Sequence, residues 1–85
     1  MKIELYGQAT KELKRLSKKN PNPARRICAK LKELSRDISI GCPLKGPLKG
    51  SYGIRIGDYR VIYDIIEKDN VILVWKIQHR REVYK

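Results

Sequence analysis

Two arginines and the only histidine of the chain fall where they could form a cationic site. If Gly57-Asp58 is a two-residue hairpin turn, Arg55 lies opposite Arg60 on one face of a sheet. If the next turn is centred on Asp69-Asn70, Arg60 also lies opposite His79. The spacing therefore predicts a row of Arg55, Arg60 and His79 across neighbouring strands.

Such a row needs a reason, because like charges opposite each other on strands cost about a few tenths to 1 kcal/mol. A bound anion supplies one, since guanidinium groups match phosphate oxygens. The alternative is a solvated face whose arginines diverge into water, and we favour the phosphate. The same register pairs Tyr52 with Tyr63. These rings could stack on RNA bases, but core packing is the favoured interpretation.

Two side chains near the C-terminus could carry protons. Imidazole suits proton transfer near neutral pH, and His79 is expected at a strand end. Tyr84 follows Arg80 and Arg81, whose charges would favour a phenolate. The alternatives are a polar surface histidine and a tyrosine that closes the core.

Metal-free cleavage of a phosphodiester, as in RNA, is the chemistry that such a set of cations, a histidine and a tyrosine can support. The sequence has no P-loop, dinucleotide-binding glycine turn, HExxH motif or nucleophile elbow. No carboxylate pair has the spacing of a metal or glycosidase site, so no cofactor is expected. The 2′-hydroxyl of RNA would attack the adjacent phosphate, and arginines would stabilise the developing charge. Proton transfer would add about two to four orders of magnitude.

Charge points to the same class of partner. Twenty Lys and Arg face nine Asp and Glu, giving a net charge of +11 over 85 residues. The charge is spread along the chain, which predicts one folded basic domain, 1–85, that binds RNA or DNA. A generally basic surface and an acidic protein partner are the alternatives. The longest apolar run, Val71–Trp75, is too short to cross a membrane. The start of the chain lacks the apolar core of a signal peptide, so a cytoplasmic location is expected.

The elements that must position these residues follow from periodicity. The expected order is β-α-α-β-β-β, an α+β fold with a helical hairpin on one face of a mainly antiparallel sheet. The expected helices and strands are Ile3–Leu5, Gln8–Lys19, Pro23–Arg36, Tyr52–Ile56, Tyr59–Ile66 and Val71–Gln78. Asn22 is the expected N-cap of the second helix, with Pro23 at its first position. The segment Ile40–Ser51 is expected to be a loop that carries Lys45 and Lys49 toward phosphates.

The cysteines do not suggest a framework. Cys28 falls on the apolar stripe of the second predicted helix and is expected to be a small core residue. Cys42 lies in the predicted loop. Their spacing does not suit zinc, and a disulfide is disfavoured in a reducing cytoplasm.

Beyond these patterns, the chain resembles the RelE/ParE toxin superfamily, and more narrowly the RelE-type toxins of bacteria and archaea. The resemblance rests on Leu44-Lys45-Gly46, on Gly50–Tyr63 (GSYGIRIGDYRVIY) and on Ile77–Tyr84 (IQHRREVY), and the order of elements also fits. It implies a toxin that enters the ribosomal A site and cuts mRNA without a metal, leaving a 2′,3′-cyclic phosphate and a 5′-hydroxyl. It also implies a cognate antitoxin that neutralises the toxin and, in complex with it, binds operator DNA.

The resemblance also assigns roles to residues. Arg60 matches the strand arginine that holds the scissile phosphate, and Arg80 matches the arginine that stabilises the transition state. Arg55 matches a basic strand residue that is often lysine, and Tyr84 matches a catalytic tyrosine near the C-terminus. A straight last strand would instead put Arg81 on the face of Arg60, so Arg81 is retained as a phosphate contact.

One departure concerns the general base. Gly53 stands where some RelE toxins have a lysine suspected of this role. The candidates to replace it are His79, Lys45, Lys49 and Tyr84. The competing functions are a toxin of the ParE type that poisons DNA gyrase and an RNA-binding module without toxicity.

Overall fold

The computed structural model describes residues 1–83. Its main elements are β1 (Lys2–Leu5), α1 (Gln8–Lys19), α2 (Pro21–Arg36), β2 (Cys42–Pro43), β3 (Tyr52–Ile56), β4 (Tyr59–Ile66), β5 (Val71–His79) and α3 (Arg80–Val83). Short 3-10 helices lie at Ile38–Ile40, Gly46–Leu48 and Glu67–Asp69.

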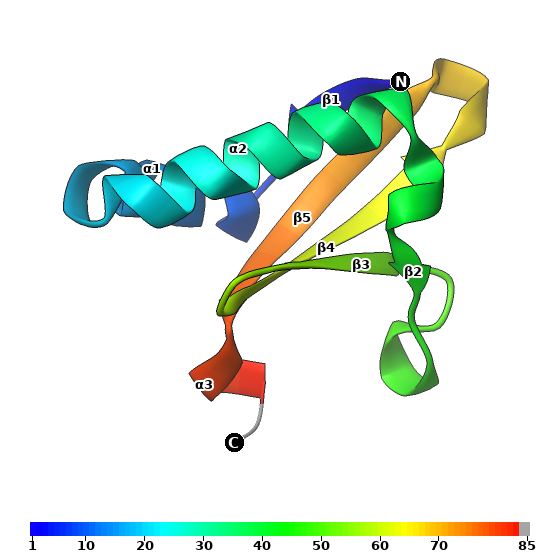
Figure 1. Cartoon of the computed structure of the whole chain (residues 1–85). Helices are drawn as coiled ribbons and strands as arrows, with labels where there is room; N and C mark the ends of the chain where they lie inside the picture. The colour runs from blue at the N-terminus through cyan, green and yellow to red at the C-terminus, as the bar shows by residue number, and fades with distance from the viewer. Residues whose placement is uncertain (84–85) are drawn as a thin grey trace.

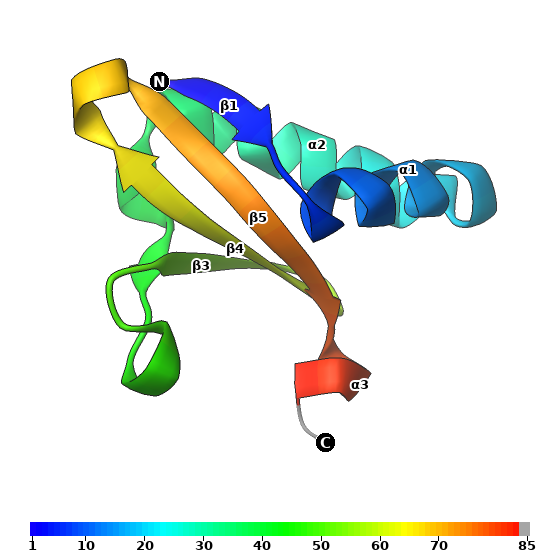
Figure 2. The ribbon, with the colours of Figure 1, turned by 180° about the vertical axis from the view of Figure 1, so that it is seen from behind.

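The strands form one five-stranded sheet in the order β1-β5-β4-β3-β2. β1 runs parallel to β5, and the other neighbouring pairs are antiparallel. α1 and α2 cover one face of the sheet (Figure 1), and the reverse view shows β1 alongside β5 (Figure 2). The expected α+β fold, with a helical hairpin on a mainly antiparallel sheet, is confirmed.

The core lies between the helices and this face of the sheet. Apolar side chains at helical spacing meet those at alternate strand positions, and burying each stabilises the fold by about 1.5–3 kcal/mol. The buried residues of this layer are Ala9, Leu16, Ala24, Ile27, Leu31, Leu34, Ile54, Ile56, Val61, Tyr63, Ile72, Val74 and Ile77.

Two expectations about α2 were wrong. The helix begins at Pro21 rather than Pro23, with Asn20 as its N-cap, so Asn22 lies inside the first turn. Pro21 suits this position because the first helical residues need no N–H donor. Cys28 is exposed, because it lies at the edge of the apolar stripe. Cys42 is also exposed, and both thiols are free.

The predicted loop 40–51 contains a strand that the sequence did not reveal. Cys42 and Pro43 of β2 pair with Gly53 and Tyr52 of β3 at the edge of the sheet. Two residues are too few to show a strand periodicity, and proline is tolerated only at such an edge.

A β-bulge in β5 changes the predicted register. Ile62 pairs with Lys76 and Tyr63 pairs with Val74, so Trp75 is an extra residue. The pairing of Arg55 with Arg60 is confirmed.

The predicted pairing of Arg60 with His79 was wrong. Arg60 lies opposite Gln78, and His79 lies opposite Tyr59. The connection is wider than two residues, since Ile66 already pairs with Val71, and this alone would place Ile77 opposite Arg60. The extra residue of the bulge then moves the partner to Gln78 and turns His79 to the other face.

Gln8 at the start of α1 extends the pairing of β5 beyond the end of β1. Its side-chain Nε2 donates to the Ile77 carbonyl at 3.0 Å, and its Oε1 accepts from the Ile77 N–H at 2.9 Å. The amide thus takes the place of a strand residue and satisfies both backbone groups of Ile77.

Tyr63 is fully buried against an unusually close backbone. Its ring stacks on Tyr52 with centroids 5.8 Å apart, which confirms the core interpretation of this pair. A Cβ on Gly41 would lie 1.6 Å from the Tyr63 hydroxyl oxygen, so Gly41 is required sterically. That hydroxyl has no hydrogen-bond partner among residues 1–83. Burial, with smaller contributions from Cys42 and Tyr52, raises the pKa of the phenol.

Gly41→Ala is therefore expected to lower the free energy of unfolding by about 1–3 kcal/mol, as overpacking does. Urea denaturation measures the loss. Tyr63→Phe removes the oxygen that clashes and should shrink the loss caused by Gly41→Ala. Gly53→Ala is the matched control and should cost less, because its Cβ would meet only the flexible tip of Leu44 at 3.0 Å. An equal loss from Gly41→Ala in the Tyr63 and Tyr63→Phe backgrounds would contradict this explanation.

Candidate functional site

The sheet face opposite α1 and α2 carries the predicted cations, and we call it the open face. Side chains alternate along β3 and β4, so Arg55 and Arg60 point to the side opposite the buried Ile54 and Val61. The β2–β3 loop and α3 both project on this side, at different ends of the sheet (Figure 1). The open face therefore lies between two further basic segments.

Arg60 is held by a neutral partner. Its Nε and Nη2 donate to Oε1 of Gln78 at 3.3 and 3.0 Å. Gln78 fixes the guanidinium without cancelling its charge, and Arg60 makes no ion pair within residues 1–83. The remaining N–H groups of Arg60 can thus meet an anion in a fixed orientation.

Arg55 and Arg60 also line a groove of about 460 Å³ at the β2 edge of the sheet. Lys30 of α2 contributes to its wall, with Cys42 and Leu44. Lys30 is paired with Glu33 at 3.2 Å on the helix surface. The groove adds an amine that the sequence analysis did not select.

The row next to Arg55–Arg60–Gln78 consists of Gly53, Ile62 and Lys76. Gln78 and Lys76 were missed because the predicted register put His79 on the open face. The sequence alone provides no clear signal, because Ile72, Leu73 and Val74 are all apolar. In the structure, Val74 and Ile77 are both fully buried although they are three residues apart. An uninterrupted strand cannot turn both to the core, so an apolar spacing of three indicates a bulge between them.

Gly53 leaves room that another side chain fills. A Cβ there would lie 3.0 Å from a methyl carbon of Leu44, so Leu44 covers the position where some RelE toxins carry lysine. A lysine at position 53 would require Leu44 to move.

His79 lies at the end of β5 on the core side of the sheet, away from Arg60. Its ring packs edge-on against Tyr59, with centroids 5.0 Å apart. Its Nδ1 accepts a hydrogen bond from the backbone N–H of Arg81 at 3.2 Å, so in the neutral imidazole Nε2 carries the proton. To accept a proton as a general base, Nδ1 would have to release the Arg81 N–H.

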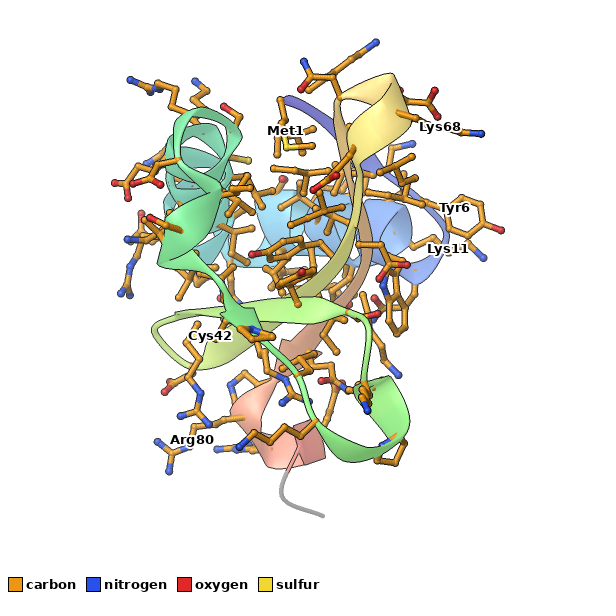
Figure 3. All side chains as sticks on the ribbon, turned by 90° about the vertical axis from the view of Figure 1, so that its right-hand side faces the viewer. Met1, Tyr6, Lys11, Cys42, Lys68 and Arg80 are labelled. Atoms are coloured by element: carbon orange, nitrogen blue, oxygen red, sulfur yellow. The ribbon has the colours of Figure 1, made fainter. Side chains whose placement is uncertain are left out.

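The end of β5 at His79 also places the two arginines that follow. α3 begins at Arg80, whose N–H donates to the Asp58 carbonyl at 2.7 Å, and whose Nη1 lies 3.6 Å from Asp58 Oδ1. Both partners of this ion pair are exposed, and such pairs contribute only about 0–1 kcal/mol. Arg80 can therefore exchange Asp58 for a phosphate at little cost. Figure 3 shows Arg80 at the opposite end of the molecule from Lys68.

Three other predicted residues lie at the surface. Lys45 and Lys49 flank the 3-10 helix Gly46–Leu48 and are exposed, as is Arg81 of α3. Tyr84 lies outside the described residues. Within residues 1–83, no group of three or more His, Cys, Asp and Glu side chains could hold a metal ion, and no helix is long and apolar enough to cross a membrane.

Known proteins share this architecture. The YoeB/ParE toxin from Agrobacterium tumefaciens superposes with a TM-score of 0.81 over 93% of this chain and 98% of its own, at 18% identity, which shows the fold alone. The archaeal RelE in the RelE–RelB complex from Pyrococcus horikoshii superposes with a TM-score of 0.71 over 93% of each chain, at 29% identity.

Sequence comparisons agree with the structural ones. The chain is 32% identical over 54 residues to toxin RelG of Mycobacterium tuberculosis, and the match spans 62% of each chain, less than two thirds of that relative. The family model for the ParE toxin of the type II toxin–antitoxin system parDE matches residues 3–84. The chain therefore belongs to the RelE/ParE superfamily of type II toxin–antitoxin toxins.

Proposed function

We propose that the protein is a ribosome-dependent endoribonuclease that cuts mRNA in the ribosomal A site and so inhibits translation. The observation that carries the proposal is the Arg55–Arg60 pair on the open face, with Arg60 oriented by the neutral Gln78. Two adjacent guanidinium groups without a carboxylate partner for Arg60 suit a phosphodiester. A net charge of +11 also favours binding at a site surrounded by ribosomal RNA, whose phosphates are negatively charged.

The reaction needs no metal or cofactor in this proposal. The 2′-oxygen forms a bond to phosphorus while the bond to the 5′-oxygen breaks, leaving a 2′,3′-cyclic phosphate and a 5′-hydroxyl. Arg60 and Arg55 hold the scissile phosphate, and Arg80 stabilises the charge of the transition state. A base accepts the 2′-hydroxyl proton, and an acid protonates the leaving oxygen.

Four residues are candidates for the general base that accepts the 2′-hydroxyl proton. His79 offers an imidazole at the strand end, provided that Nδ1 releases the backbone N–H of Arg81, and Lys45 and Lys49 offer amines on the open-face side of the sheet. Tyr84 remains a proposal from the family resemblance. Arg81 and the two lysines are further phosphate contacts.

The proposed partners follow from the family and the charge. RelE of Pyrococcus horikoshii was crystallised with RelB. We propose that this chain likewise has a cognate antitoxin, which neutralises it in the cytoplasm and brings it to operator DNA only as a complex. The ribosome and mRNA are the targets of the free toxin.

A second candidate function is poisoning of DNA gyrase without nuclease activity. Two observations favour it: the matching family model is that of the ParE toxin, and Gly53 supplies no amine next to Arg55. Both functions are possible on one fold, because function resides in the site.

Primer extension on mRNA in a purified translation system separates the two. With the nuclease, cuts appear only on ribosome-engaged mRNA. If a folded protein arrests growth and leaves the mRNA intact, the nuclease proposal is wrong and a gyrase supercoiling assay is the next measurement.

Replacing either Arg60 or Arg80 is expected to relieve toxicity. Arg60→Ala and Arg80→Ala should each lower single-turnover cleavage by about 10²–10³-fold, the usual cost of one charge-stabilising donor. Lys68→Ala is the matched control, since Lys68 lies in the β4–β5 turn at the far end of the molecule (Figure 3). Full toxicity in a folded Arg60→Ala or Arg80→Ala variant would refute the assigned site.

If His79 is the general base, His79→Gln should lower single-turnover cleavage by about 10²–10⁴-fold. An unchanged cleavage rate in the folded variant would exclude His79 and leave the lysines and Tyr84.

A further inference from the structure

The bulge in β5 turns two consecutive residues toward the same side of the sheet. Lys76 pairs with Ile62, which alternates with Arg60 on the open face. Trp75 is the extra residue, and its indole Nε1 donates to Oδ1 of Asp64 at 3.2 Å. Asp64 follows Arg60 by four positions along β4, so it also lies on the open face. In a regular strand Trp75 and Lys76 would point to opposite faces.

The Trp75 ring is fixed by a short hydrogen-bond chain. The Asp64 carboxylate that accepts from the indole also accepts from the Ser51 hydroxyl. The only polar atom of the Trp75 side chain is thus satisfied within the protein, while the ring remains partly exposed. What the ring offers to a ligand is its apolar π surface.

Lys76 adds a positive charge beside this ring. It is partly exposed, and within residues 1–83 it makes no ion pair or side-chain hydrogen bond. Asp64, an acidic residue on the open face of the neighbouring strand β4, is occupied by Ser51 and Trp75. The Lys76 ammonium is therefore available for an anion.

We propose that Trp75 and Lys76 form a nucleotide subsite for single-stranded RNA, next to the phosphate site at Arg55 and Arg60. One base stacks on the Trp75 indole, and Lys76 binds a phosphate of the same strand. Residues two apart on a strand are separated by about 7 Å, so Lys76 lies about one step of an extended nucleotide strand from the row of Arg60 and Gln78. The subsite rests on the proposed RNA function and assigns where a neighbouring base is held.

The protein contains a single tryptophan, so its fluorescence reports on this position alone. The titration uses the full-length protein at low salt, with a fluorophore-labelled 2′-O-methyl RNA oligonucleotide that cannot be cleaved. An abasic sugar–phosphate strand of the same length is the control. We expect the RNA to quench Trp75 emission along the binding curve given by anisotropy, and the abasic strand to bind with little quenching.

Three outcomes would overturn the subsite. One is RNA binding with unchanged Trp75 emission, as expected of a tryptophan that has only a packing role. The second is equal quenching by the abasic strand, and the third is no RNA binding. These results are independent of cleavage: absence of cuts on ribosome-engaged mRNA would refute the nuclease, while base-dependent quenching would still support the subsite.

Variants separate the two side chains. Trp75→Leu should weaken RNA binding by about 5- to 150-fold, the range for loss of one stacked base. Trp75→Phe keeps a stacking ring and should recover most of the affinity, which a packing defect would not explain. Lys76→Met should lower the slope of log affinity against log salt by about 0.7, the value for one phosphate contact with a single strand. Lys68→Met, at the distant turn, should leave the slope unchanged, and a Lys76→Met slope equal to wild type would remove Lys76 from the subsite.

Discussion

The extra residue at Trp75 is the constraint on which the arrangement of the open face depends. On one side of the bulge, β5 turns Ile72 and Val74 to the helices, and on the other side it turns Ile77. Without the inserted residue, the second half of the strand would present its apolar side chains to water and its polar ones to the core, because a one-residue slip reverses the facing of every side chain. The same insertion brings Gln78 opposite Arg60. Core packing and the composition of the site are thus settled by one local irregularity.

The helical hairpin covers only one face of the sheet, and the other face carries cations with few carboxylates. Charge repulsion there is tolerated because the arginine pair costs at most about 1 kcal/mol, whereas the buried layer supplies many times that amount. Gln78 is important in this balance, since a glutamate in its place would hold Arg60 equally well but neutralise it. Of the acidic side chains that the register places on this face, Asp64 is engaged by Ser51 and Trp75, and Glu4 of β1 lies 3.9 Å from Lys2. The positive charge at Arg60 is therefore preserved, because its own partner is neutral.

The order of the elements and the Arg55–Arg60 pair could be predicted from the sequence for a clear physical reason. A two-residue hairpin turn fixes the register of its strands, and helical and strand periodicities are strong in α1, α2 and β3. The register of β4 with β5 could not be predicted in the same way, because the connection is longer and the bulge comes after it. His79 was therefore placed on the wrong face, and Gln78 and Lys76 were overlooked. Strand β2 was missed because two residues carry no periodicity, and Cys28 was misplaced because the edge of a helical stripe is not sharply defined by sequence.

The side chain of Gln8 has a consequence for the behaviour of the chain in solution. β1 protects β5 only as far as Val74, so the second half of β5 would otherwise present an unpaired strand edge. Such an edge is a template for another chain. The Gln8 amide occupies both hydrogen-bonding groups of Ile77 and closes that template with one side chain. Gln8 thus protects this part of the β5 edge from pairing with a strand of another molecule.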